Sequence, residues 1–581
     1  MNLTRRQFIA LMSTAAAAGL LPRGASFAAA GDFYDFPFSG NVRLLHFTDC
    51  HAQLLPIYFR EPNANIGIGE ASGRVPHLVG EHLLKRYPNL SEPYIHALTY
   101  LNFTEDARRF GKVGGFAHLS TLVKQLRAAA GENRTLLLDG GDTWQGSGTA
   151  YWTRGKDMVG ACNLLGVDVM TGHWEFTYND DEILQQLKEV NGDFVAHNVR
   201  LTEEGLFDGK PAYDEASGHV FPPYVIKDMA GVRVAVIGQA YPYTPISNPR
   251  RFIPHWTFGI REAELQELVT EIREREKPSV VVLLSHNGAD IDLKLASRVE
   301  GIDVILGGHT HDGVVEAVEV ANRSGRTLVS NGGSNGKFLG VMDLHVKNNK
   351  VADYHYRLLP VFANLLPADK EMQAYIDQVR APYAEKLGEQ LAVADDLLYR
   401  RGNFNGTFDQ LICEALAERL DTQIALSPGF RWGTTVLPGQ AVSMEHVLDQ
   451  TCMTYPETYA TEMTGQQLKL IFEDVCDNLF NTDPYLQQGG DMVRVTGMNY
   501  VCDPTASMGN RISDMQLDNG KAIEADKSYR VSGWATVGSQ SPGAPVWDVV
   551  ADYLRDKKIA SVNKLNTPKL VNMAHNLGWS T

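Results

Sequence analysis

The sequence has few cysteines and no clustered positive charge, and both absences exclude classes of protein. Its six cysteines are scattered over 581 residues with no Cys-x-x-Cys pair, so no disulfide scaffold organises the chain. One bridge in an oxidising compartment stays open, among Cys413, Cys452, Cys476 and Cys502. Lysine and arginine number 53 against 69 acidic residues, a net charge of -16. A nucleic-acid surface needs clustered Lys and Arg, so we expect no nucleic-acid partner.

Long apolar runs are also missing. The apolar stretch Phe8–Leu21 is shorter than the ~20 residues that a membrane-spanning helix needs. It follows Thr4-Arg5-Arg6-Gln7-Phe8-Ile9, which looks like a twin-arginine export signal, and precedes the small-residue cleavage site Ala25-Ser26-Phe27-Ala28. We therefore expect residues 1–30 to be a signal peptide, the mature chain to be periplasmic, and no membrane insertion after the signal is removed. We expect a monomer.

The rest of the chain divides into two regions. Residues 31–366 alternate short apolar runs with amphipathic helical stretches, which predicts an α/β layered domain. Residues 367–390 predict one connector helix, with apolar side chains at helical spacing. Residues 391–581 predict an α+β domain. An irregular insertion at 58–110, rich in proline and aromatics, interrupts the first domain. Loops of that length are usually functional or disordered.

Five apolar runs each end in residues that bind metals. Because parallel strands deliver their carboxyl ends to one crevice, we expect these residues to converge. Strand alternation also predicts that Asp49 and His51 point the same way and that Cys50 points away. The seven candidate ligands are Asp49, His51, Asp142, His173, His286, His309 and His311.

Two carboxylates and five imidazoles are enough to hold two metal ions that share one carboxylate. Oxygen and imidazole ligands without thiolate suit manganese, zinc, iron or cobalt. A lone histidine after a strand is more often a hydrogen-bonded structural residue. Five such runs, each followed by a potential ligand, argue against a purely structural role for all of them. The sequence therefore predicts a binuclear metal site.

The blocks Leu-His-Phe-Thr-Asp-Cys-His, Gly-Gly-Asp-Thr-Trp-Gln-Gly-Ser, Leu-Leu-Ser-His-Asn-Gly and Gly-Gly-His-Thr-His resemble the 5'-nucleotidase branch of the calcineurin-like metallophosphoesterases. The resemblance implies a four-layer αββα catalytic domain, a connecting helix and a C-terminal domain that holds substrate against the metals. It implies one metal on Asp49, His51, Asp142 and His311. The other metal would take Asp142, His173, His286 and His309.

One block departs from this family. Where the family reads Gly-Asn-His-Glu-Phe-Asp, the sequence has Gly172-His173-Trp174-Glu175-Phe176-Thr177. His173 replaces an asparagine ligand, Trp174 replaces the catalytic histidine, and Thr177 replaces the aspartate that orients it. All seven metal positions remain able to bind. A sulfur leaving group needs less help than an alkoxide, because a thiol has a pKa of ~8.5 and departs as the anion.

This pattern, with Ser427-Pro428-Gly429-Phe430-Arg431-Trp432-Gly433, resembles the thiosulfohydrolases of the bacterial sulfur-oxidation (Sox) pathway. The resemblance implies two Mn²⁺, although the ligands alone do not choose manganese over zinc. It implies a substrate sulfonate carried on a cysteine of the sulfur carrier protein SoxYZ, from which sulfate is released. It implies that Asp142, His173, Trp174 and Arg431 are catalytic and that Trp174, Arg431 and Asn403 bind substrate.

Two other functions stay open. A periplasmic 5'-nucleotidase or cyclic-nucleotide phosphodiesterase fits most of the motifs, and Phe430 with Trp534 is a candidate pair for stacking on a base. A non-catalytic homologue that keeps its metals for structure is the second alternative, although structural metal sites are usually coordinatively closed. The insertion 58–110 is interpreted as a channel or docking surface for the carrier arm, or as a structural insertion.

Overall fold

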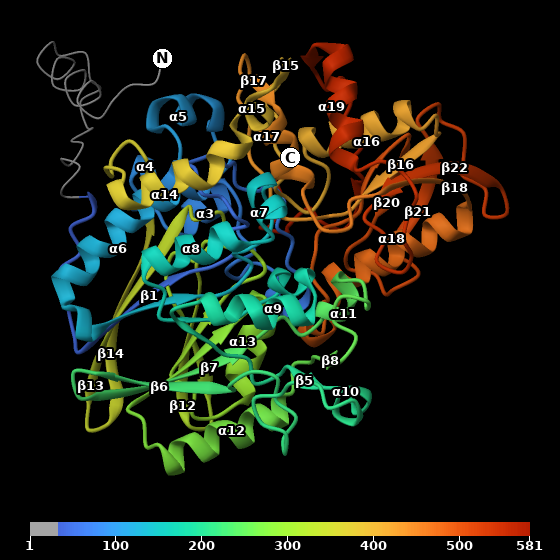
Figure 1. Ribbon diagram of the computed structural model, residues 1–581. Coiled ribbons are helices and arrows are strands. Elements are labelled where there is room, and N and C mark those ends of the chain that lie inside the picture. Colours follow the sequence, from blue (N-terminus) through green and yellow to red (C-terminus); the bar gives the residue numbers. More distant parts are fainter. Residues whose placement is uncertain (1–32, 581) are drawn as a thin grey trace, which may run out of the picture.

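The structure is a computed structural model that describes residues 33–580, so the predicted signal peptide lies outside the described residues. The catalytic domain contains two six-stranded sheets (Figure 1). The strands of the first, in spatial order, are β14 (Lys350–Pro360), β13 (Phe338–Lys347), β1 (Val42–Phe47), β2 (Thr135–Asp139), β3 (Val169–Met170) and β4 (Asp193–Phe194). Those of the second are β11 (Val318–Asn322), β12 (Gly325–Asn331), β10 (Val304–Gly307), β9 (Val280–Ser285), β7 (Val232–Gln239) and β6 (Tyr224–Met229).

The two sheets pack face to face, and helices cover their outer faces. Buried apolar side chains from both sheets, such as Leu44, Leu138, Val282 and Leu306, form one core cluster between them. Helices α6 (Phe116–Ala130) and α8 (Lys156–Leu165) pack on the first sheet, and α12 (Glu262–Arg275) and α13 (Ala289–Arg298) pack on the second. The predicted four-layer αββα arrangement is therefore confirmed.

The connector is helical but is not one helix. It consists of α14 (Lys370–Arg380), the 3-10 turn η5 (Ala381–Tyr383) and α15 (Ala384–Gly388). Pro382 lies in η5 and has no N–H to donate, so the regular i→i−4 hydrogen bonding of an α-helix is interrupted there. The prediction of a single helix over 367–390 is wrong at this point.

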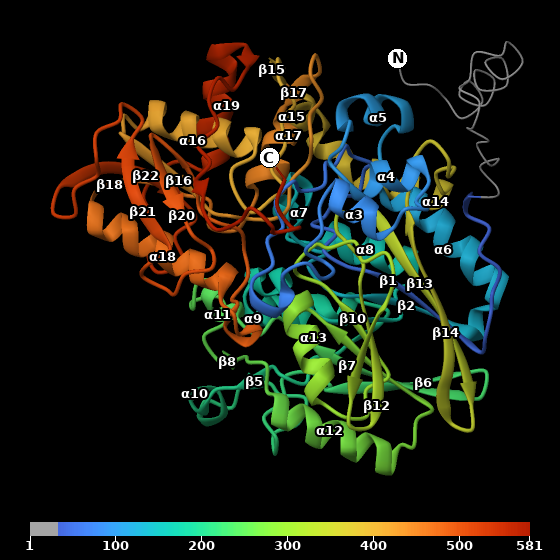
Figure 2. The same ribbon diagram turned by 180° about the vertical axis from the view of Figure 1, so that it is seen from behind.

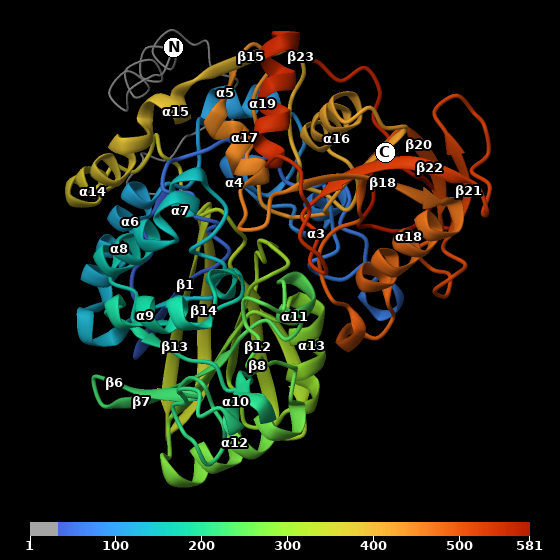
Figure 3. The same ribbon diagram turned by 45° about the vertical axis from the view of Figure 1, so that its right-hand side comes forward.

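The C-terminal domain is a separate α+β lobe (Figure 3). Its largest sheet has the order β18 (Thr458–Thr464), β22 (Ser528–Trp534), β16 (Ile424–Ser427) and β19 (Arg494–Thr496). Its longest helices are α16 (Thr407–Arg419), α18 (Gly465–Phe480) and α19 (Val546–Lys557). Smaller elements are β15 (Gln390–Ala394), β17 (Ala441–Ser443), α17 (Met444–Thr451), η6 (Pro484–Leu486), β20 (Met498–Cys502), β21 (Ile512–Leu517), β23 (Ile559–Ala560) and β24 (Lys569–Leu570).

The insertion is more ordered than the sequence predicts. It contains η1 (Gly69–Ala71), α3 (Glu81–Arg86), α4 (Glu92–Leu98) and α5 (Phe103–Phe110), so the prediction of an irregular segment is wrong for these helices. Ala64 and Ile66 belong to a core cluster of the C-terminal domain, whereas Leu83 and Phe110 pack on the catalytic domain. The insertion therefore contacts both domains.

The catalytic domain also contains several shorter elements. They are η2 (Glu132–Arg134), α7 (Gly148–Thr153), η3 (Trp174–Tyr178), α9 (Asp180–Gln186), η4 (Leu187–Glu189), β5 (Arg200–Leu201), α10 (Glu203–Phe207), α11 (Thr244–Ser247) and β8 (Trp256–Thr257). Among residues 33–580, no helix has the length and apolar character needed to cross a membrane.

Candidate metal centre

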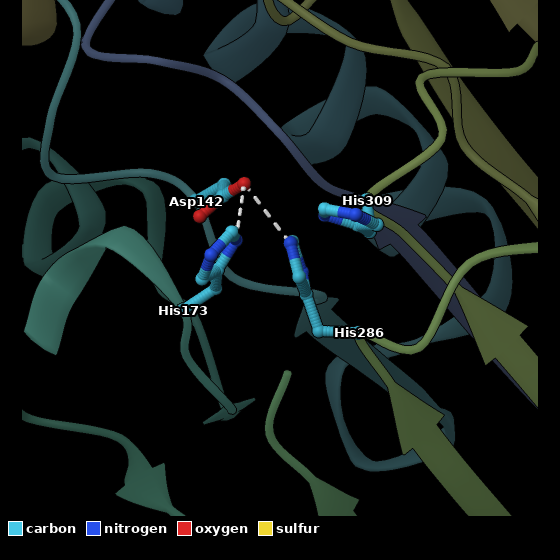
Figure 4. Close-up of side chains that lie close together, drawn as sticks. All are labelled: Asp142, His173, His286 and His309. Atoms are coloured by element: carbon cyan, nitrogen blue, oxygen red, sulfur yellow. Dashed lines mark hydrogen bonds and ion pairs between the residues drawn. The ribbon is translucent and has the colours of Figure 1, made fainter. Parts of the chain in front are cut away.

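The seven predicted ligands meet at the carboxyl ends of the strands. One group is formed by Asp142, His173, His286 and His309 (Figure 4), and a second by Asp49, His51, Asp142 and His311. In each group the ligand atoms lie within 4.8 Å of one another, and every member is buried. Asp142 belongs to both groups, as a carboxylate that bridges two ions must. The donor set therefore fits a binuclear centre of oxygen and imidazole ligands.

The backbone around the ligands is unusual. Five of the seven have positive φ angles although none is glycine: Asp49, His51, Asp142, His309 and His311, with φ between 44° and 73°. Such conformations cost about 1–3 kcal/mol each and persist where the surroundings enforce them. Asp49 and His51 follow the end of β1 and lie in left-handed turns. Their shared direction therefore does not arise from strand alternation, and that part of the prediction is wrong.

Hydrogen bonds from the protein fix the imidazole orientations. His286 Nδ1 lies 2.6 Å from the carbonyl oxygen of Gly140, and its Nε2 lies 3.0 Å from Asp142 Oδ2. His51 Nδ1 lies 3.2 Å from the carbonyl oxygen of Gln145. A carbonyl oxygen only accepts, so both Nδ1 atoms carry a proton, and Nε2 is the nitrogen of each ring that faces the other ligands.

His309 is fixed by contacts from outside its own loop. Its ring stacks on Tyr241 at a centroid distance of 4.1 Å, and Tyr241 also contacts the ring of His173. A Cβ on Gly489 would lie 2.1 Å from His309 Nε2, so only glycine allows the C-terminal domain to approach this closely. Gly489 has a φ of 76°, which glycine adopts without strain.

Glu175 holds the loops that carry two of the ligands. Its two carboxylate oxygens accept the backbone N–H groups of Asp142, Thr143, Trp144 and His173, at 2.7–3.2 Å. Its side chain is completely buried. Removing the carboxylate would leave four buried donors without partners, each at a cost of about 1–3 kcal/mol.

The environment of the site disfavours the protonated, charged form of its histidines, except at His286. Burial lowers the pKa of His51 to about 4, so it is neutral, as a metal ligand must be. Burial also disfavours charge on His286, but Asp142 and Asp49 outweigh it and raise its pKa to about 10. Burial acts to raise the pKa of Asp142, yet His173 and His286 hold it well below its usual value.

Trp174 forms part of an aromatic wall beside the ligands. Its backbone N–H donates to Asp142 Oδ1 at 2.7 Å, and its ring meets Trp432 and Phe430 edge to face. Phe430 and Trp432 stack on each other with centroids 4.1 Å apart, and Trp432 also stacks on His51. Trp174 is only 5% exposed and Trp432 is also buried, whereas Phe430 is partly exposed.

The two other predicted substrate residues lie at a small cavity next to His309. Arg431 donates to the carbonyl oxygens of His309 and Gly490. Asn403 donates to Asp491 Oδ1 at 3.1 Å and accepts the backbone N–H of Ile66 at 2.7 Å. Both residues line the cavity, and both side chains are engaged within the protein.

Sequence reasoning missed three residues that shape the site. Tyr241 and Trp432 pack on metal-binding rings, and Gly489 allows the close approach to His309. Two signals were visible: Trp432 lies in the block Ser427–Gly433, and the Gly-Gly pair at 489–490 is of a kind that marks special backbone geometry. Aromatic residues far along the chain give no signal of what they contact.

Comparisons with known proteins match this geometry. A model of the 5'-nucleotidase C-terminal domain matches residues 392–547. The structure of Thermus thermophilus sulfate thiohydrolase SoxB in complex with glycerol is 36% identical, with a TM-score of 0.85. The match covers 93% of this chain and 98% of that one. The chain belongs to the 5'-nucleotidase family of calcineurin-like metallophosphoesterases.

Other members of the family are more distant. A 5'-nucleotidase precursor of Thermus thermophilus has the same fold, with a TM-score of 0.71 at 21% identity over 91% of this chain and 99% of that one. The trifunctional nucleotide phosphoesterase YfkN of Bacillus subtilis is 28% identical over 74% of this chain, which spans 31% of the length of YfkN. Family members are metal-dependent hydrolases, and this chain has the residues to hold two metals.

Proposed function

We propose that the protein is a dimanganese thiosulfohydrolase. Its substrate is a cysteine that carries a terminal sulfonate through a sulfur–sulfur bond, Cys–S–S–SO₃⁻. Water adds its oxygen to the sulfonate sulfur and the S–S bond breaks. The products are sulfate, the persulfide Cys–S–S⁻ on the carrier and two protons, so the reaction needs no oxidant or reductant.

The observation that carries this proposal is Trp174 beside the complete ligand set. The family's catalytic histidine and its orienting aspartate are replaced together, by Trp174 and Thr177, whereas all seven ligands converge. That dyad assists an alkoxide leaving group. A sulfur leaving group departs as the anion near neutral pH and does not need it. The aromatic wall offers a polarisable, water-poor surface for the departing sulfur.

The same wall argues against a nucleotide base. Phe430 and Trp432 lie in direct contact, so no ring fits between them. Phe430 and Trp534 meet at an interplanar angle of 73°, which is not the geometry of a parallel clamp. The cavity next to His309 has a volume of about 50 Å³, whereas pockets for drug-sized ligands hold roughly 300–1,000 Å³. A sulfonate group needs much less room than a nucleoside.

The residues of the site have separate roles in the proposed reaction. Two manganese ions on the seven ligands would lower the pKa of the attacking water and draw charge from the sulfonate oxygens. Arg431 and Arg401 line the cavity and offer positive charge to an anion. The backbone N–H of Trp174 orients Asp142, which bridges the two groups.

The proposal includes a partner and a compartment. The carrier SoxYZ presents the cysteine, and the twin-arginine signal at residues 1–30 directs the enzyme to the periplasm. The names of several relatives, including bovine 5'-nucleotidase at 24% identity over 72% of this chain, favour the alternative that the substrate is a nucleotide.

One experiment separates the three functions. Purified protein is incubated with manganese and either a carrier peptide bearing Cys–S–S–SO₃⁻ or AMP, and sulfate and phosphate are measured. A thiosulfohydrolase releases sulfate and little phosphate. A 5'-nucleotidase releases phosphate from AMP and little sulfate. A protein that binds two metals, melts at a higher temperature with them and hydrolyses neither compound is the non-catalytic homologue.

A further inference from the structure

Asp290 joins three parts of the chain beside the site. It lies in the first turn of α13, and both of its carboxylate oxygens are 3.1 Å from Nε2 of His77, which belongs to the insertion. The side chain of Gln487, from the C-terminal domain, also hydrogen-bonds to it. The side chains of His77 and Asp290 are each 12% exposed. We call His77, Asp290 and Gln487 the latch.

The insertion presents His77 in a fixed orientation. His77 Nδ1 lies 3.2 Å from the carbonyl oxygen of Asn65, so Nδ1 donates there and Nε2 faces Asp290. The ring packs against Gly67, where an added Cβ would lie 2.6 Å from His77 Cγ. Asn65 is itself anchored, because its Nδ2 donates to Asp312 at 2.9 Å. The latch is therefore a positioned contact rather than a chance pairing of surface charges.

The latch lies between two cavities. The inner cavity of about 50 Å³ is lined by the metal ligand His309 together with Arg401, Arg431 and His77. An outer groove of about 1010 Å³ is lined by residues of the insertion, α13, β11 and the loop before η6. Asp290 and Gln487 line both. In Figure 2 the insertion loop lies next to α13 and the lower end of the C-terminal lobe.

A second ion pair joins the same two domains outside the latch. Lys294, one turn along α13, contacts Asp483 at 2.6 Å and lies over the ring of Tyr485. Lys294 and Asp483 line the outer groove but not the inner cavity. This pair offers a control, because it fastens the same surfaces without separating the two spaces.

We propose that the latch determines which substrates reach the metals, an inference that rests on the proposed thiosulfohydrolase function. A small sulfonate enters the inner cavity and the latch closes behind it. A sulfonate on a carrier cannot be enclosed, because its chain must pass between the two cavities throughout turnover. The latch residues are then parted in the bound state, and the lost contacts weaken binding of the carried substrate. His77, Asp290 and Gln487 are specificity-determining residues that do not touch the reacting atoms.

The test compares a short and a long substrate. Asp290→Asn and His77→Ala weaken the latch, and Lys294→Met is the matched control. We expect the latch variants to lower the KM of the carrier peptide about tenfold at unchanged kcat, and to leave the KM of free cysteine thiosulfonate unchanged. Lys294→Met should change the KM of neither substrate. Equal changes for both substrates, or none for the peptide, would overturn the proposal.

A second measurement does not depend on the substrate. A fluorescent metal chelator that approaches the manganese-loaded centre from the outer groove passes the latch, and its signal follows metal loss. We expect a rate about tenfold higher in both latch variants than in wild type and Lys294→Met, measured well below the melting temperature of all four proteins. If wild type hydrolyses neither sulfonate, the proposed function fails while this rate still tests the latch as a barrier. Equal rates in all four proteins would overturn the barrier itself.

Discussion

The two sides of the pocket are built differently. The ligand side, made of the seven metal ligands, consists of buried loops at strand ends, held by backbone hydrogen bonds and left-handed turns within one domain. The cover side consists of His77, Arg431, Gln487 and Gly489, which come from the insertion and the C-terminal domain and meet the first side through side-chain contacts. In the proposed function, the chemistry belongs to the ligand side and substrate selection to the cover side.

The largest expected effect is on the ligand side. Asp142→Asn removes the carboxylate that both ligand groups share, so we expect manganese to be lost and activity to fall by about 10³-fold or more, beyond the 10–100-fold typical of an outer partner. Metal content is measured by mass spectrometry. Asp157→Asn alters another buried carboxylate, outside both groups, and should keep both metals. Full metal content in Asp142→Asn would contradict the assigned centre.

The next effect tests why Trp174 is present. The double variant Trp174→His with Thr177→Asp restores the family's dyad, and we expect hydrolysis of glycerol phosphate, whose leaving group is an alkoxide, to rise by about 10²-fold, within the usual contribution of general acid–base catalysis. Trp174→His alone lacks the orienting carboxylate and should gain less. The measurement is the rate of phosphate release with manganese bound. No gain in the double variant, with both metals bound, would remove the explanation given for the substitution.

A cover-side effect of intermediate size is expected at Gly489. In Gly489→Ala the new methyl group meets His309 Nε2, so we expect the manganese dissociation constant to rise about tenfold, within the range for outer partners. Gly490→Ala is a close control, since Gly490 has a similar φ of 78° but its nearest neighbouring atom, the carbonyl oxygen of Gly429, lies at 3.8 Å. Isothermal titration calorimetry measures the manganese dissociation constant of both variants. Equal weakening in the two variants would attribute the effect to backbone strain instead.

The smallest effect concerns pH. Burial disfavours charge on His77, but Asp290 raises its pKa to about 9 from an ordinary 6.5. The contribution to stability is therefore complete below about pH 6.5 and is lost as the pH rises through 9. We expect His77→Gln to melt a few degrees below wild type at pH 6 and at nearly the same temperature at pH 10. A gap that stays constant from pH 6 to 10 would show that the charge of His77 does not matter.

Much of the catalytic domain was predictable because its signals are local. The alternation of apolar runs and helical stretches over residues 31–366 predicts the α/β layers, and all seven ligands follow apolar runs that form buried strands or their ends. The left-handed turns at Asp49 and His309 were not predictable, because positive φ is uncommon for any residue other than glycine, although Asp and His adopt it more often than most. The helices of the insertion and the contacts of Tyr241 and Asp290 depend on partners far away in sequence, which no local pattern encodes.

The position of the insertion has a consequence for the order of assembly. Its residues Ile66 and Gly67 hydrogen-bond to Asn403 and Asn576, which are 337 and 509 positions further along the chain. Contacts that close such long loops form late. We expect the strand-end loops to gain protection from hydrogen exchange earlier in refolding than residues 64–78, as pulse labelling with mass spectrometry measures. Manganese would then have open access to its ligands before the last segment settles over them.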